Sequence, residues 1–232
     1  MSKTETAMNK LIDEILKEGK KQNVFEVFNT FIELAALSLS IISVADSRME
    51  RLQRHLEICR QLDRKSIEAY GRMLEYLFEA AAMAMDEPYD ILGTVFHKLD
   101  LHNKWKGQFF TPSQISRLMA EIAGGDLLPK KGFITVSDPA CGSGSLLLGT
   151  VCQQKQRNLD YQHHALFVAQ DIDIRCVWMC YIQMYLFRIP AIVIHGDSLA
   201  VEEWEHWYTP GIYALDFDDE LEVQGVIEEN KA

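Results

Sequence analysis

Apolar residues between positions 1 and 100 recur with the 3.6-residue period of an amphipathic α-helix. Within residues 4–19, Leu11 and Ile15 fall on one stripe, and Gly19 provides a stop signal. Residues 24–44 are apolar on nearly every face, which predicts a buried helix. No strand is expected in this half. The same pattern predicts three further helices, over residues 48–62, 64–85 and 88–99, the last with Pro88 in its first turn.

The second half of the chain changes to short apolar runs separated by helical stretches. Strand–helix alternation of this kind predicts an α/β fold whose parallel sheet has right-handed crossover connections. The expected strands cover residues 132–138, 164–171 and 191–197, and the expected helices cover about 144–157 and 173–188.

Each of the three expected strands ends in an aspartate, at Asp138, Asp171 and Asp197. Because ligands bind beyond the carboxyl ends of parallel strands, these side chains are expected at one site. Asp171 ends the second strand, where an acid can accept both hydroxyls of a ribose, and Ile172 would lie flat against a nucleobase. Asp197 could accept from an exocyclic amino group. Each acid alone is more often a helix cap or a turn residue, but their occurrence on consecutive strands favours a ligand site.

A glycine-containing loop, "VSDPACGSGSLLLG", spans residues 136–149. Gly142 and Gly144 allow positive φ angles and close approach of the backbone to a ligand, and the following helix presents N–H groups that favour an anionic group. The loop lacks the lysine of a nucleoside triphosphate loop, and Leu147 stands where a dinucleotide-binding loop has its third glycine. A carboxylate-bearing ligand remains one interpretation, and a tight strand-to-helix turn without a ligand is the other.

An aromatic pair precedes the expected sheet in "KGQFFTPSQISRLM", residues 106–119. Pro112 and Ser113 are typical of a helix start. Phe109 and Phe110 would pack either in the core, at a domain junction, or against a ligand.

Four motifs in this order resemble those of adenine-specific DNA methyltransferases, especially the modification subunits of type I restriction-modification systems. The resemblance covers roughly residues 88–200 and implies a Rossmann-like, S-adenosylmethionine-dependent methyltransferase sheet, preceded by an all-helical domain. It suggests domains over residues 1–104 and 105–200 and an acidic segment over 201–232. The matching segments are "GQFFTP" (107–112), "DPACGSGSLL" (138–147), "FVAQDID" (167–173), with Asp171 in place of a glutamate, and "HGDSL" (195–199).

The resemblance implies S-adenosyl-L-methionine as the cofactor and assigns a role to each matching residue. Residues 108–112 and the glycine loop would cradle the methionine part, and Asp138 would orient its ammonium group. Asp171 would hold the ribose, Ile172 would pack on adenine, and Asp197 with Ser198 would read the adenine edge. The expected contacts are Gln108, Phe109, Phe110, Thr111, Pro112, Asp138, Gly142, Ser143, Gly144, Ser145, Asp171, Ile172, Asp197 and Ser198.

One motif of that family is missing. The family transfers its methyl group with an Asn-Pro-Pro-aromatic motif on the fourth strand, which holds the flipped adenine. None of the six prolines is adjacent to another or follows an asparagine. The chain is therefore truncated relative to the family pattern, and its catalytic residues are unknown. Residues 212–215 are expected to form a strand, and the tail or a second subunit is expected to lie along the third strand or its neighbour and so cover the open edge of the sheet.

Three functions follow from these motifs. The first is a cofactor-binding DNA adenine methyltransferase that is inactive alone or depends on a partner. The second is a non-enzymatic regulatory or interaction module that retains cofactor binding. The third is an RNA or protein methyltransferase with a different base, for which the candidates are Glu202, Glu203, Glu205 and His206.

The net charge of −11 is unevenly distributed. Residues 197–232 carry eleven acids and one lysine, which makes that segment −10 and leaves about −1 for the rest. Net acidity argues against nucleic acid as a partner, but here it belongs to the tail. The one basic cluster consists of Arg48, Arg51, Arg54, His55, Arg60, Arg64 and Lys65. Within it, Arg51 and Arg54, with Arg48 a third candidate, share a helical face. That face would either contact DNA phosphates or be solvated and paired with Glu50 and Glu57.

The five cysteines form no repeated pair spacing, which fits a reduced, cytoplasmic protein. Cys176 and Cys180 lie four residues apart on an expected helix. They are predicted to be buried apolar residues rather than metal ligands, since no second pair completes a zinc site. No apolar stretch is long enough for a transmembrane helix, and no secretory signal is expected.

Overall fold

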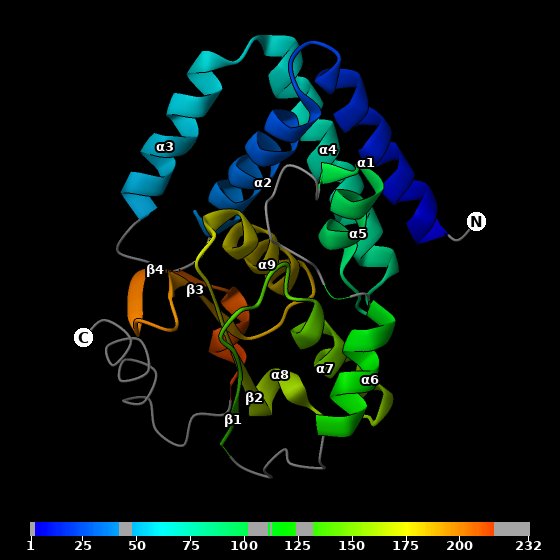
Figure 1. The fold of residues 1–232 in the computed structure, drawn as a ribbon, viewed down its shortest axis with the longest axis vertical. Helices are drawn as coiled ribbons and strands as arrows, with labels where there is room; N and C mark the ends of the chain where they lie inside the picture. Colours follow the sequence, from blue (N-terminus) through cyan, green and yellow to red (C-terminus); the bar gives the residue numbers. More distant parts are fainter. Residues whose placement is uncertain (1–2, 42–47, 102–110, 112, 124–131, 216–232) are drawn as a thin grey trace.

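The computed structural model describes residues 3–41, 48–101, 111, 113–123 and 132–215. Helices α1 to α5 gather at one end of the molecule, and the sheet lies at the other (Figure 1). The elements in chain order are α1 (Lys3–Gly19), α2 (Val24–Ser40), α3 (Arg48–Gln61), α4 (Arg64–Met83), α5 (Ile91–Lys98), α6 (Ser113–Ala123), β1 (Ile134–Asp138), α7 (Ser145–Gln156), α8 (Tyr161–His164), β2 (Ala165–Asp171), α9 (Ile174–Leu186), β3 (Ala191–Asp197), β4 (Glu202–Tyr208) and the 3₁₀ helix η2 (Pro210–Ala214).

The expected helices and the first three strands are confirmed, with two corrections. Helix α5 begins at Ile91 and not around Pro88, because the Asp90 carboxylate accepts from Gly93 N and forms the N-cap. The strand expected over residues 212–215 is wrong. Pro210 opens η2 there, and a proline at the first helical position suits a helical turn because its φ angle is already helical.

The sheet has the order β1-β2-β3-β4, and its first three strands are parallel. Strand β4 runs antiparallel to β3 and covers its outer edge, as expected for the segment after the third strand. Asp138 pairs in register with Ala169, and Asp171 pairs with His195. The carboxyl ends of β1, β2 and β3 therefore lie at one edge of the sheet.

The two faces of the sheet differ in their cover. Phe167, Ala169 and Val193 share the main hydrophobic core with residues of α7 and α9. On the opposite face, Leu166 and Ile192 belong to a smaller apolar cluster that includes Ile212 of η2. Helix α2 packs on α9, which explains why nearly every face of α2 is apolar. The helical half and the sheet thus share one core, while the division into domains at residue 104 stays a prediction.

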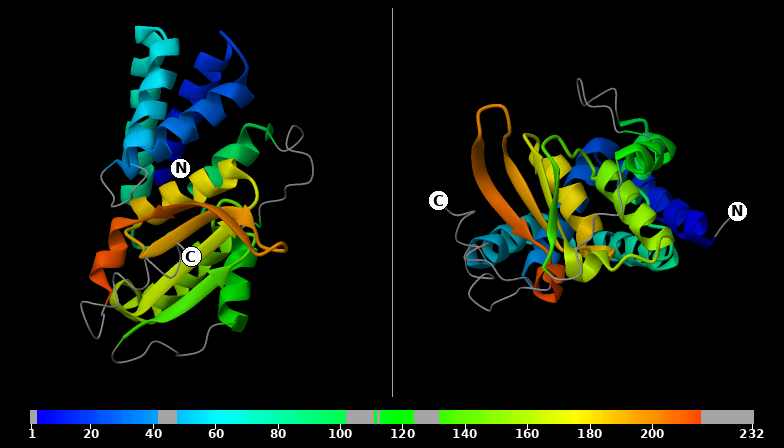
Figure 2. Two further views of the ribbon diagram at one scale, coloured as in Figure 1. Left: turned by 90° about the vertical axis from the view of Figure 1, so that its left-hand side faces the viewer. Right: turned by 90° about the horizontal axis from the view of Figure 1, so that it is seen from below.

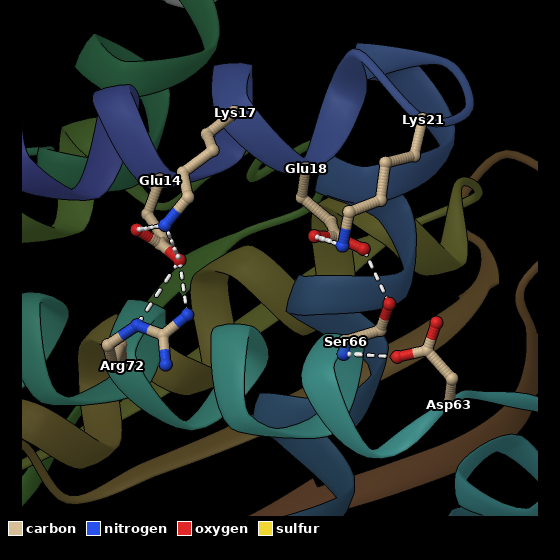
Figure 3. Close-up of polar contacts among 7 residues, drawn as sticks. All are labelled: Glu14, Lys17, Glu18, Lys21, Asp63, Ser66 and Arg72. Carbon is tan, nitrogen blue, oxygen red and sulfur yellow. Dashed lines mark hydrogen bonds and ion pairs between the residues drawn. The ribbon is translucent and has the colours of Figure 1, made fainter.

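Helices α1 and α4 are joined by ionic and hydrogen-bonded contacts (Figure 3). Glu14 of α1 pairs with Arg72 of α4 at 2.6 Å. Glu18 is buried and accepts a hydrogen bond from the Ser66 hydroxyl at 2.5 Å, and Asp63 caps α4 by accepting from Ser66 N. A buried carboxylate needs such donors, so Glu18 aligns the two helices.

Helix α3 is fixed to the sheet by Arg51, and this corrects the prediction for the basic cluster. The Arg51 guanidinium is buried 3.8 Å from the ring centroid of Trp207 on β4 and pairs with Glu205 at 3.0 Å. Arg54 pairs with Glu33 of α2 at 2.7 Å. Arg51 therefore lies neither on a phosphate-binding face nor on a solvated one, and both partner acids come from other elements.

The predicted burial of Cys176 and Cys180 is confirmed. The described residues contain no group of three or more His, Cys, Asp and Glu side chains placed to hold a metal ion. Among the helices described above, none combines the length and apolarity needed to cross a membrane.

Candidate functional site

The loop after β1 is shaped by two glycines in the left-handed region. Gly142 has φ 54° and Gly144 has φ 90°. A Cβ added to Gly144 would lie 2.9 Å from Sγ of Cys180, so a side chain is excluded both by conformation and by space. Cys141 N donates to Gln170 O at 2.9 Å, which holds the loop beside the end of β2.

Asp171 links this loop to the start of α9. Its Oδ2 accepts from Gly142 N and its Oδ1 accepts from Asp173 N, both at 2.9 Å. Burial raises the pKa of the Asp171 carboxyl, and the backbone hydrogen bonds oppose that rise. Each carboxylate oxygen can accept a second hydrogen bond, so the group still has acceptor capacity. The next side chain, Ile172, is 60% exposed at the same edge.

One carboxylate oxygen of Asp138 lacks a hydrogen-bond donor among the described residues. Its Oδ1 accepts from Ala140 N at 3.2 Å. Its Oδ2 is buried and has no hydrogen-bond partner among the described residues. Burial, and then the charge of Asp171, raise the pKa of this carboxyl. A buried, unpaired acceptor is unfavourable unless a donor is supplied, which makes Oδ2 a place for a ligand N–H group.

The Asp197 carboxylate accepts hydrogen bonds from backbone N–H groups of the turn that follows β3. Its Oδ1 accepts from Leu199 N at 2.9 Å and from Ala200 N at 3.2 Å. This is the turn-residue role that the sequence allowed for each acid. Ser198 is half-buried in the same turn. The assignment of both residues to an adenine edge stays a prediction.

The two serines of the loop point into the protein. Ser143 is buried, and its hydroxyl donates to Asp90 Oδ2 at 2.5 Å. The Ser145 hydroxyl donates to Thr111 O at 2.9 Å and lies 2.7 Å from the Ser116 hydroxyl. Both hydroxyls are thus engaged inside the protein, and we expect these positions to reach a ligand through their main chain. The other expected contacts before the sheet lie outside the described residues: Gln108, Phe109, Phe110 and Pro112.

The sequence patterns did not identify Gln183 of α9, whose side chain holds the glycine loop against the start of α5. Its Oε1 accepts from Ile91 N at 2.7 Å and Leu92 N at 3.1 Å, and its Nε2 donates to Asp90 Oδ1 at 2.9 Å and Ser143 O at 2.7 Å. Burial raises the pKa of the Asp90 carboxyl despite these donors. The signal in the sequence was a lone amide within the apolar run of α9.

A family model, described as N-6 DNA Methylase, matches residues 88–218, which is more than half of the chain. The chain belongs to the N-6 DNA methylase family. This membership implies S-adenosylmethionine as its cofactor. The match includes the glycine loop and the acids of β1, β2 and β3.

Relatives of this chain include the type I restriction enzyme MpnII methylase subunit of Mycoplasma pneumoniae. That protein is 26% identical over 215 residues, which cover 88% of this chain and 35% of the relative. The chain thus spans about a third of the length of this curated relative. A solved type I restriction-modification methyltransferase subunit from Streptococcus thermophilus aligns with a TM-score of 0.45 and 16% identity, over 88% of this chain and 60% of that one.

Three features of the structure fit the cofactor of this methylase family. Asp138 Oδ2 is a buried acceptor suited to an ammonium group. Helix α7 begins at Ser145, and its N-cap residue, Gly144, makes no side-chain cap bond to the first-turn N–H groups, which is a position that suits a carboxylate. Ile172 offers an exposed apolar surface beside Asp171. Together they fit a ligand with an amino-acid end and a nucleoside end.

Proposed function

We propose that this chain binds S-adenosylmethionine at the carboxyl edge of β1, β2 and β3 as the cofactor-binding part of an adenine-specific DNA methyltransferase. The observation that carries the proposal is Asp171, which is bonded to the loop and to α9 and lies next to the exposed Ile172. Asp171 would accept the ribose hydroxyls, and Asp138 Oδ2 would accept from the ammonium group. The bound cofactor would supply the methyl group, while these residues bind and orient it.

We further propose that methyl transfer requires a partner subunit. The 232 residues contain no Asn-Pro-Pro motif. Two acids considered as replacement bases have structural partners, since Glu205 pairs with Arg51 and Glu203 contacts His206 at 2.9 Å. Within the part of the chain that the structure describes, β1 pairs with β2 alone. Its other edge offers backbone groups to a strand that a partner would supply.

Calorimetric titration with S-adenosylmethionine tests the cofactor site. We expect micromolar affinity for the wild-type chain and a loss of about tenfold or more for Asp171→Ala, since a hydrogen bond to a charged group contributes about 1.5–3 kcal/mol. Asp160→Ala, at an exposed aspartate before α8, should bind like the wild type. If the wild-type chain gives no heat of binding, the proposed cofactor site is wrong.

Tritiated cofactor tests the transfer step. The chain alone should transfer no label to DNA, and label in adenine would show that it carries its own catalytic residues.

A second candidate function is a non-enzymatic module that senses the cofactor. The bonds from Gln183 to Ser143 of the loop and to Asp90 at the start of α5 favour it, because they couple the site to the helical half. A cofactor-induced change in helix protection from hydrogen exchange, without transfer in any complex, would favour the second function.

A further inference from the structure

The hairpin that joins β3 to β4 projects beyond the rest of the sheet (Figure 2). It exposes three large apolar side chains: Leu199 is 95% exposed, Val201 87% and Trp204 51%. Val201 has φ 58°, a conformation that a β-branched residue rarely adopts. We call Leu199, Val201, Glu202, Glu203 and Trp204 the hairpin patch. Neighbouring exposed apolar side chains on a projection are typical of a surface that contacts another molecule.

The ring of Trp204 is held in place although half of the side chain is exposed. Its Nε1 donates to Glu202 Oε2 at 3.1 Å, and its ring packs edge-on against His195, with centroids 4.9 Å apart at 84°. The Glu202 carbonyl in turn accepts from Gln170 Nε2 at 3.0 Å. A ring fixed in this way loses little conformational entropy when a ligand covers it.

The hairpin patch borders the proposed cofactor site. His195, which contacts Trp204, has its Nε2 3.2 Å from Ile172 O. Ile172 directly follows Asp171. A molecule that lies on Trp204 would therefore sit next to the edge where the methyl donor is proposed to bind.

Charge decides which kind of molecule fits this surface. Residues 189–215 contain no lysine or arginine. Of their four acids, Glu205 is paired with Arg51 and Glu203 contacts His206 at 2.9 Å, and Asp197, Glu202 and Glu203 line the hairpin. These carboxylates repel phosphate groups and attract cations. The exposed face of Trp204 adds a favourable site for a lysine or arginine side chain.

We propose that the hairpin patch docks a basic polypeptide segment with apolar side chains, beside the cofactor site. The placement beside a methyl donor rests on the proposed function, whereas the docking itself does not. Leu199 and Val201 would contact the apolar groups of that segment, and Trp204 with the flanking carboxylates would bind its cations.

A fluorescein-labelled peptide of four Arg-Leu-Gly repeats serves as the probe, with fluorescence anisotropy as the readout. Trp204→Ala should weaken peptide binding roughly threefold to thirtyfold, while Trp204→Phe stays within about twofold of the wild type. The double variant Glu202→Gln, Glu203→Gln should weaken binding and flatten its salt dependence. The amide that Glu202→Gln introduces can still accept from the indole N–H of Trp204. As the matched control, Glu75→Gln with Glu121→Gln removes two exposed acids elsewhere and should leave binding unchanged.

Two results would overturn the proposal. Equal peptide affinity for the wild type and every patch variant would show that the patch does not dock it. Tighter, Trp204-dependent binding of a labelled 12-nucleotide single strand would assign the surface to nucleic acid. Titration with S-adenosylhomocysteine separates this proposal from the proposed function: wild type and Trp204→Ala should bind it equally, and failure of both would refute the cofactor site while the peptide result stands.

Discussion

Replacing Gln183 with leucine tests whether the amide network beneath the glycine loop stabilises the fold. Gln183 is buried and uses both donors and both acceptor positions of its amide. Leucine has a similar volume, so the packing change is small. The substitution leaves Ile91 N, Leu92 N and Ser143 O without this partner, whereas Asp90 Oδ1 keeps its bond from Gly93 N.

The expected cost follows from these three backbone groups. An unsatisfied buried group costs about 1–3 kcal/mol, and partial relaxation keeps the total below the simple sum. We expect Gln183→Leu to lower the free energy of unfolding by about 3–5 kcal/mol. For a chain of this size, that corresponds to a fall in Tm of about 6–20 °C.

Gln153→Leu provides the matched control in urea and thermal unfolding. Gln153 lies on α7, is equally buried, and has no hydrogen-bond partner for either side-chain polar atom among the described residues. Its replacement removes two unsatisfied groups and should leave stability within about 1 kcal/mol of the wild type or raise it. Similar losses of unfolding free energy in the two leucine variants would contradict this prediction, because the hydrogen bonds of Gln183 would then contribute nothing beyond the volume of the side chain.

Three further predictions concern Gly71, Gly144 and the pair of Asp138 and Asp171. Gly71→Ala should raise the free energy of unfolding by about 0.5–1 kcal/mol in urea denaturation, because Gly71 lies inside α4 and an added Cβ meets nothing within 4 Å; a loss of stability would contradict this. Gly144→Ala should lower the free energy of unfolding by about 1–2 kcal/mol because of the φ angle of 90° alone, and it should weaken cofactor binding in calorimetry. Unchanged stability would contradict this and show that the loop relaxes. The third prediction uses the raised pKa values of Asp138 and Asp171, which mean that these groups bind protons more tightly in the folded chain. As pH falls through those raised values, protonation should favour the folded chain at both positions while weakening the proposed cofactor contacts. Calorimetric titrations with the cofactor from pH 7.5 down to about 4, the value of an ordinary aspartate, should therefore show affinity that already declines within this range. Affinity that stays constant down to that value would contradict the prediction.

The sequence was sufficient where local pattern decides structure. Each run that ends in Asp138, Asp171 or Asp197 became a parallel strand. Strands β2 and β3 are buried along most of their length, which needs a continuous apolar run, whereas β1 alternates half-buried and exposed residues. The glycine loop could also be predicted, since the φ angles of 54° at Gly142 and 90° at Gly144 lie in the region that favours glycine.

The sequence did not predict side-chain contacts that depend on residues far away in the chain. Arg51 looked like a surface residue because its helical face carries no sign that Trp207 and Glu205 of β4 pack on it. The inward direction of the Ser143 hydroxyl likewise depends on Asp90, 53 residues earlier. The run after Pro210 resembled a strand because apolar composition alone cannot separate a short strand from a helical turn.

A crystal structure of the chain with S-adenosylhomocysteine would locate the cofactor site. We expect both ribose hydroxyls within hydrogen-bond distance of Asp171, the adenine ring on Ile172 and the ammonium group at Asp138 Oδ2. Electron density for the ligand at another place would contradict this expectation, for example in the pocket of about 430 Å³ whose lining includes Phe78 and Tyr185.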